Sequence, residues 1–315
     1  MSPVSSRRIR TLPANSRPAG SPGARAARRW NICSTASTLK LMARNKVGFA
    51  GFLVVSTIVL VTFIGPVFLP SEVPVNVDEI YETPSFSHPL GTDSEGKDVL
   101  LQIINGGRPI LTIGFLAAAI STTIAVTLGS LSGFAGGRVD TGFTWLADMV
   151  LTIPQLPLLA VLAGVLRLNS KIAVAGLIGL LFWPTLMRAI RAQVLSLKER
   201  DYVESARALG LGTPHIVFRE IAPNMAGYIA INFTLAVTAS MYFVVALTLL
   251  GLVPLSEDNW GVMLNLAWTR GAIFSKDSVF YIMSPIAAIV LFQLGLVAMN
   301  RSLSEIFDPR LRRGS

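Results

Sequence analysis

Six long apolar runs divide this chain, and each is long enough to cross a lipid bilayer as a helix. They cover roughly residues 47–69, 109–133, 143–167, 171–195, 225–251 and 279–300. The first run has 23 residues and would extend about 34 Å as a helix, which is enough for the hydrocarbon core of a bilayer. Barrel strands would show alternation, which these runs lack. We therefore expect an all-α integral membrane protein with six transmembrane helices.

The composition agrees with a lipid environment. Hydrophobic residues make up 52% of the chain and charged residues 14%, whereas a soluble domain is usually about a quarter charged. Cys33 is the single cysteine, so an intramolecular disulfide framework is excluded, and His88 and His215 stand far apart without further cysteines. Metal sites usually need several such ligands. We expect no metal site, and the sequence contains no nucleophile–base arrangement that would indicate a catalytic residue or a bound cofactor.

Charge is distributed unevenly along the chain. Residues 1–46 contain ten basic side chains and no acidic one, whereas the loop at 70–108 contains seven acidic and two basic residues. Basic flanks remain on the cytoplasmic side of a membrane. Six crossings then place both termini and the loop at 198–224 in the cytoplasm, and the loops at 70–108 and 252–278 outside.

The first 40 residues are predicted to form a disordered basic arm, followed by the transmembrane domain at 41–315. Their Ser, Pro, Ala and Arg content cannot bury a core. Nucleic-acid binding is one interpretation of such an arm, but a cytoplasmic tail beside anionic lipid explains the same charge and is favoured. Ser6-Arg7-Arg8 is similar to a twin-arginine export signal, yet the first apolar run begins too far away, near Val47.

The outer loop contains a near match to a phosphate-binding loop. Gly91 to Asp98 approximates the pattern G-x-x-x-x-G-K-[ST], but Asp98 replaces the hydroxyl that would hold magnesium. Asp93 and Glu95 also place negative charge where phosphates would lie. We therefore reject nucleotide binding and expect a looped segment that leads into an interfacial helix from Asp98 to Arg108.

Proline and small residues are frequent in and around the apolar runs. Proline removes a backbone hydrogen bond and allows a helix to bend, and it occurs here as Pro66, Pro154, Pro157, Pro184 and Pro285. The small residues at 129–137 permit close approach between helices. A bundle that moves and ordinary membrane-helix packing are both consistent with these features.

Polar side chains inside the apolar runs are candidates for function, because hydrocarbon cannot satisfy them. Thr234, Thr238 and Tyr242 recur every four residues and share one face of the fifth run. Lining of a pore and hydrogen bonding between helices both fit this stripe. Asp148 is the one acidic residue expected within a run, where a proton relay and an ion pair with Arg188 are the alternatives.

The segment at 198–224 is polar and prone to form helices. Residues 198–209 favour a helix, and Gly210 and Gly212 would end it. A second helix is expected to begin with Thr213 as its N-cap and Pro214 in the first position.

The first of these two helices is predicted to be amphipathic. The spacing places Tyr202, Val203, Ala206 and Leu209 on one side and Arg200, Glu204 and Arg207 on the other. Docking of a soluble partner and simple packing against the inner ends of the apolar runs are both consistent with this pattern.

Four segments, in order, resemble the permease subunits of ABC importers. Glu204-Ser-Ala-Arg-Ala-Leu-Gly210, followed by Ile221-Ala-Pro-Asn224, resembles their E-A-A-x-x-x-G loop, with Ser205 in place of the second alanine. Residues 88–100, 192–203 and 307–312 resemble the C-type permease subunit of dipeptide and oligopeptide importers. The resemblance covers about residues 40–313.

This resemblance implies the type I permease fold of ABC importers, in a bacterial plasma (inner) membrane. The implied partners are a second homologous permease subunit, two cytoplasmic ATPase subunits or one fused ATPase that bind ATP and Mg, an extracytoplasmic substrate-binding (lipo)protein, and membrane lipid, with no nucleic acid. Peptides are the implied substrate, with nickel or another small solute as the alternative. An ATP-independent secondary transporter is less favoured, because Asp148 is the one embedded charge and no internal repeat is evident.

The resemblance also implies a site at which the ATPase subunits bind the permease, within residues 200–216. Its expected members are Arg200, Asp201, Tyr202, Glu204, Ser205, Ala206, Arg207, Gly210, Leu211, Gly212, Thr213 and Pro214. Thr234, Thr238 and Tyr242 stay candidates for the translocation path formed with the partner permease, with hydrogen bonding between helices as the alternative.

Overall fold

The computed structural model describes residues 45–70, 73–166, 168, 170–253 and 259–307. The chain divides into two compact units, Met1–Leu41 and Met42–Ser315, and all described residues belong to the second. The basic arm at 1–40 and the segment at 308–312 therefore lie outside the described residues, and what we expect of them stays a prediction.

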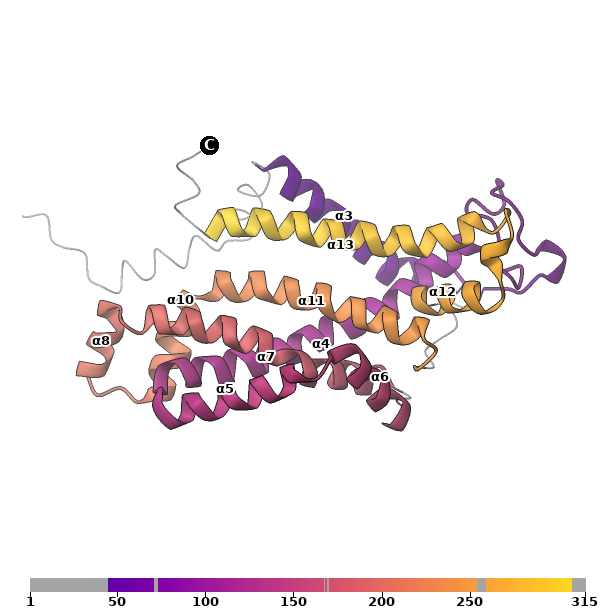
Figure 1. Cartoon of the computed structure of the whole chain (residues 1–315). Helices are drawn as coiled ribbons and strands as arrows, with labels where there is room; N and C mark the ends of the chain where they lie inside the picture. The colour runs from indigo at the N-terminus through magenta and orange to yellow at the C-terminus, as the bar shows by residue number, and fades with distance from the viewer. Residues whose placement is uncertain (1–44, 71–72, 167, 169, 254–258, 308–315) are drawn as a thin grey trace, which may run out of the picture. The chain divides into compact units, whose positions relative to one another are not determined.

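Five helices in the described part of the chain are long and apolar enough to cross a membrane, judged by length and composition (Figure 1). They are α3 (Lys46–Phe68), α4 (Val99–Ala135), α7 (Lys171–Leu197), α11 (Ala226–Leu249) and α13 (Val279–Phe307). The described residues contain no strand. The all-helical architecture predicted from the apolar runs is confirmed.

The third apolar run, expected as one span at 143–167, forms two helices. Helices α5 (Gly137–Thr152) and α6 (Gln155–Leu166) meet at 82°, so a sixth span exists only if this bent pair is counted as one. Ile153 adopts an extended conformation (φ −89°, ψ 130°). It precedes Pro154, whose ring disfavours the helical conformation of the residue before it.

Helix α4 begins earlier than the second apolar run. The separate interfacial helix expected from Asp98 to Arg108 is wrong, because these residues form the first turns of one helix of 37 residues. The Asp98 carboxylate caps this helix by accepting the backbone N–H of Leu101 at 3.0 Å. Pro109 lies inside the helix and removes one backbone hydrogen bond without ending it.

Helices α4 and α7 pack with their backbones close together. A Cβ atom on Gly129 would lie 2.7 Å from the carbonyl oxygen of Met187, and one on Gly133 would lie 2.9 Å from that of Arg191. Any larger residue would force the helices apart. The close approach predicted for the 129–137 segment is confirmed at these two glycines.

Two groups of buried apolar residues form the interior. The larger connects α4, α7, α11 and α13 and includes Ile110, Ile113, Ile178, Met241 and Phe292. The smaller surrounds the end of α7 and includes Met187, Ile190, Val194, Val203 and Ile216. The second group ties the segment at 198–224 to the membrane helices.

The opposite end of the bundle carries the loop at 73–98 together with η2 (Val77–Glu79), α12 (Trp260–Thr269) and η4 (Ala272–Phe274) (Figure 1). Helix α12 lies inside the expected outer loop at 252–278 and was not predicted. Its Trp260 indole N–H donates to the carbonyl of Ile103 on α4 at 2.8 Å. The Tyr281 hydroxyl on α13 donates to the carbonyl of Met263 at 3.0 Å. These contacts make α12 a folded part of the bundle.

Candidate functional site

The segment at 198–224 folds as a helix, a glycine turn and a second helical stretch. Its elements are α8 (Asp201–Ala208), α9 (Thr213–His215), the π-helix η3 (Ile216–Ile221) and α10 (Ala222–Asn224). The order of elements agrees with the prediction, but the N-cap of the second stretch is Gly212 and not Thr213. The π-helical turns were not predicted, and such turns often occur at functional sites.

Gly210 ends α8 in a left-handed conformation, with φ of +71°. The N–H of Leu211 donates to the carbonyl of Ala206 at 3.2 Å, and the N–H of Gly210 donates to that of Arg207 at 2.9 Å. These two hydrogen bonds form a Schellman motif, which satisfies carbonyl groups at the end of the helix. The turn therefore depends on a residue that accepts positive φ.

One side of α8 packs against the membrane helices. Val203 and Ala206 are buried with Val194 of α7, and Tyr202 and Leu211 pack at the edge of the same cluster. Burial raises the pKa of the Tyr202 hydroxyl. These side chains support α8 from within, so Tyr202, Ala206 and Leu211 belong to the packed side of the predicted site.

Leu209 departs from the predicted pattern. It was expected on the apolar side of α8, but 77% of it is exposed. The reason is that α8 ends at Ala208, and the chain leaves the packed surface at the turn that follows. The other side of α8 and the turn present an exposed surface formed by Arg200, Asp201, Glu204, Ser205, Arg207, Leu209, Gly210, Gly212, Thr213 and Pro214.

Two side chains of α8 make contacts that the sequence alone did not predict. The guanidinium carbon of Arg207 lies 4.9 Å from the centroid of the Phe134 ring on α4, within range of a cation–π interaction. The Ser205 hydroxyl donates to the carbonyl of Asp201 at 2.8 Å. Ser205 replaces the alanine of the E-A-A-x-x-x-G loop, and its hydroxyl is hydrogen-bonded within the helix.

The stripe on α11 does not share one environment. Thr234 is buried, whereas 57% of Tyr242 is exposed. The Thr234 and Thr238 hydroxyls donate to the carbonyls four residues before them, at 3.0 and 3.1 Å. The Gln293 amide on α13 donates to the carbonyl of Thr238 at 3.3 Å. Hydrogen bonding within and between helices therefore accounts for the threonines, and Tyr242 is the member on an open surface.

Asp148 forms an ion pair with Arg188 of α7. Of the two alternatives for Asp148, the structure contains the ion pair. Both side chains are about half exposed, at 52% and 48%.

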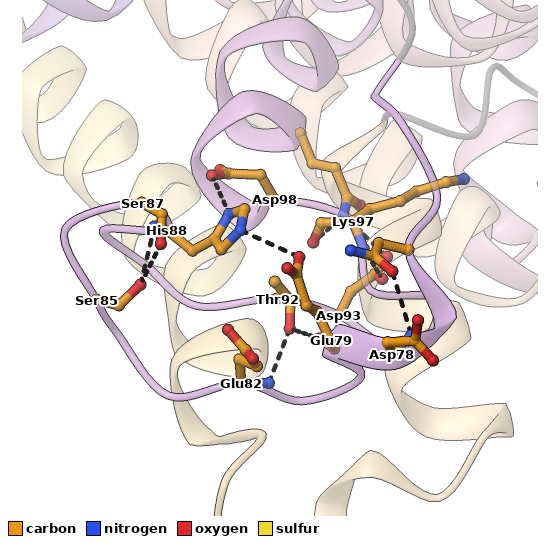
Figure 2. Close-up of polar contacts among 12 residues, drawn as sticks. Asp78, Glu79, Glu82, Ser85, Ser87, His88, Thr92, Asp93, Lys97 and Asp98 are labelled. Atoms are coloured by element: carbon orange, nitrogen blue, oxygen red, sulfur yellow. Dashed lines mark hydrogen bonds and ion pairs between the residues drawn. The ribbon is translucent and has the colours of Figure 1, made fainter.

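The segment at 91–98 is a closed turn around a carboxylate. Asp93, shown with Lys97 in Figure 2, accepts the backbone N–H of Lys97 at 2.9 Å. It also accepts the backbone N–H of Glu95 at 2.7 Å and the side-chain amide of Gln102 at 2.8 Å. The backbone donors that would hold a phosphate are thus already used by the carboxylate of the chain itself. The geometry supports the rejection of a phosphate-binding loop.

His88 connects two carboxylates of the segment at 73–98. Its Nδ1 lies 2.9 Å from an Asp98 oxygen, and its Nε2 lies 3.3 Å from a Glu79 oxygen (Figure 2). The hydrogen bond to Asp98, aided by the nearby charges of Asp98, Glu79 and Glu82, raises the pKa of His88. The sequence did not lead us to predict this contact, although His88 and Asp98 both belong to the segment at 88–100. Among the described residues, no group of three or more His, Cys, Asp or Glu side chains could hold a metal ion.

Comparison with known proteins identifies similar membrane components. Residues 125–313 match the family described as "Binding-protein-dependent transport system inner membrane component". A protein of Brucella suis biovar 1 (strain 1330) with the provisional name of a peptide permease protein is 31% identical over 270 residues, 85% of this chain and 88% of the relative.

Two further relatives carry transport names. The oligopeptide transport system permease protein OppC of Bacillus subtilis (strain 168) is 30% identical over 271 residues, 85% of this chain and 87% of the relative. The dipeptide transport system permease protein DppC of Alkalihalophilus pseudofirmus is 27% identical over 280 residues, 87% of this chain and 89% of the relative.

Proposed function

Because this chain belongs to the family of binding-protein-dependent transport system inner membrane components, we propose that it is one of two permease subunits of an ATP-driven peptide importer. The names of the relatives support peptides as the substrate class. The chain itself is non-catalytic, and ATP and Mg bind to partner ATPase subunits. An external binding protein delivers the substrate, and the complex lies in a bacterial inner membrane with both termini of this chain in the cytoplasm.

The observation that carries the proposal is the two-sided construction of α8. Its inner side is buried with Val194 of α7, while its outer side and the Gly210 turn are exposed. A partner ATPase binds this outer surface within residues 200–216. Force on the outer side reaches the membrane helices directly, because the inner side is part of their apolar packing.

The mechanism is mechanical. Closure of the ATPase subunits on ATP moves α8, and the membrane helices switch the path from inward-facing to outward-facing. Such coupling requires that ATP-bound ATPases and substrate each favour one of the two states by their own binding free energy. Tyr242 lines the path with the partner permease, since it is the exposed member of the α11 stripe.

Reconstitution tests this function. The chain, purified with its co-expressed permease, ATPase and binding-protein partners, is placed in liposomes loaded with ATP. We expect uptake of labelled di- and oligopeptides that requires both ATP and the binding protein. Uptake of nickel without peptide uptake would contradict the substrate class. Substrate flux through the chain alone, without ATP or partners, would identify it as a secondary transporter.

A further inference from the structure

A polar bridge joins three helices at the end of the bundle that carries α8. Arg191 of α7 donates through its Nε and one terminal nitrogen to the two carboxylate oxygens of Asp140 on α5, each at 2.5 Å. The Ser132 hydroxyl of α4 donates to the same carboxylate at 2.5 Å. We call these three residues the Asp140 bridge. A bidentate arginine–carboxylate pair fixes both distance and orientation.

Apart from the bridge, helix α5 is joined to α4 at Gly136, pairs Asp148 with Arg188 of α7, and packs Phe143 at the edge of the smaller apolar group. All of its residues are described, and Ala147 is the one that is buried. Apolar packing therefore contributes little to its attachment within this chain. The Asp140 side chain is sheltered, with 18% of its surface exposed, so its interactions are screened less by water than those of a surface pair.

The Asp140 bridge lies close to α8 along two routes. Three residues separate the end of α7 from the start of α8, and Val194, one turn after Arg191, is buried with Val203 of α8. On the other route, Arg207 of α8 covers the ring of Phe134, two residues after Ser132. Figure 1 shows α8 at the end of the bundle where α5 begins. Helix α8 thus contacts the two helices that the bridge connects to α5.

We propose that Asp140 and Arg191 are positioning residues that transmit the movement of α8 to α5. When a partner displaces α8, its apolar side moves α7, and the bidentate contact obliges the first turns of α5 to follow. This inference rests on the proposed function, because the bridge adds a direct connection from α7, which α8 packs against, to α5, beside the chain connection of α5 to α4 at Gly136. Without the bridge, ATP hydrolysis would continue while the first turns of α5 followed α7 less closely.

The same two helices provide a matched control. Asp148 lies eight residues after Asp140 on α5 and pairs with Arg188 on α7. That pair makes a single contact and is about half exposed, so it is expected to contribute little energy. The control substitution is Asp148→Asn. It changes the same residue type on the same helix as Asp140→Asn and leaves the Asp140 bridge intact.

The experiment measures peptide uptake per ATP hydrolysed in liposomes that contain the full complex. For Asp140→Asn we expect this ratio to fall about fivefold or more, the lower end of typical coupling between sites, with ATP hydrolysis retained. Asp148→Asn should keep the wild-type ratio. The exchange variant Asp140→Arg/Arg191→Asp should recover part of the loss, because it restores the pair. A purely structural role would lower uptake and hydrolysis together with the amount of assembled complex.

Three outcomes would overturn the inference. The first is a wild-type ratio in Asp140→Asn, and the second is an equal loss in Asp140→Asn and Asp148→Asn. If the Asp140→Asn complex does not assemble, Arg191→Lys replaces it in the test, because lysine retains the charge but loses the bidentate contact. The third outcome is a wild-type ratio of uptake to ATP hydrolysis in Arg191→Lys. Absence of ATP-dependent uptake by the wild-type complex would overturn the proposed function itself, and this inference with it.

Discussion

His88 places each of its ring nitrogens against a carboxylate, that of Asp98 and that of Glu79. A neutral imidazole has one N–H donor and one acceptor, so it can satisfy only one of these carboxylates. The imidazolium form donates to both. The geometry and the raised pKa of His88 therefore both favour the imidazolium form.

Stability of the segment at 73–98 should depend on pH through His88. Because the folded pKa is raised above the ordinary value of 6.5, the contribution is complete below pH 6.5 and is lost as the pH rises through the folded pKa. Amide hydrogen exchange across residues 77–98 should accelerate over that range, after correction for the intrinsic dependence on pH.

The substitution His88→Gln should remove this dependence, since glutamine does not titrate there. The second histidine of the chain, His215 of α9, provides the control. His215→Gln should leave the profile of the segment at 73–98 unchanged. The same pH profile in wild type and His88→Gln would contradict the assignment.

Gly210 is the residue on which the turn after α8 depends. Gly210→Val should destabilise the turn by about 1–2 kcal/mol, because a β-branched residue resists positive φ. Gly210→Asn is the matched control, since asparagine tolerates this conformation. We expect transport to fall in Gly210→Val and to be largely kept in Gly210→Asn, with equal membrane insertion of both, measured by uptake and by immunoblot of membranes. Normal transport by the valine variant would contradict the role of the turn.

At the scale of the element, α8 has an inner side that holds it in place and an outer side that is free for a partner. Charge reversal by Glu204→Arg should reduce transport without lowering the amount of folded protein, because Glu204 is exposed. Val203→Asp would bury an unpaired charge. It should therefore lower the free energy of unfolding by about 3 kcal/mol or more and reduce the amount of folded protein. Uptake and thermal unfolding of the detergent-purified complex separate the two effects.

A control for the outer side lies in the turn before α8. Glu199 is exposed but stands outside the helix, so Glu199→Arg should retain transport. Equal loss in Glu199→Arg and Glu204→Arg would show that the whole segment responds to charge, and would contradict a specific binding surface on α8.

Hydrophobic length predicted the long helices well and their breaks less well. Helices α3, α7 and α11 begin and end within about two residues of the apolar runs, since lipid selects such runs by length. The run at 143–167 instead contains the bend at Pro154, and α4 extends ten residues upstream of its run because Asp98 caps it there. Hydropathy alone predicts neither the bend at Pro154 nor the cap at Asp98, although both residues are present in the sequence.

At the scale of the whole molecule, the two ends of the bundle differ in construction. The end with α8 leaves a polar surface exposed, whereas the other end is closed by hydrogen bonds from Trp260 and His88 and by the ion pair between Arg270 and Glu95. The proposed transmission of movement from one end to the other requires packed helices between them, and α4 and α7 are in such close contact.

The sequence by itself determined that this protein is a helical membrane component with a helix–glycine–helix segment. Both properties follow from local features: the length of the apolar runs, and the position of Gly210 after good helix formers. The family resemblance could be recognised from short motifs for the same reason.

Only the tertiary structure decided which polar side chains meet. Asp140 and Arg191 are 51 residues apart, and Arg207 reaches Phe134 across a still longer interval of the chain. Such pairs depend on the rotation and separation of packed helices, which no local pattern encodes. The prediction that Leu209 lies on the apolar side of α8 was wrong for a related reason. The helical spacing of apolar residues extends to Leu209, but the helix itself ends at Ala208.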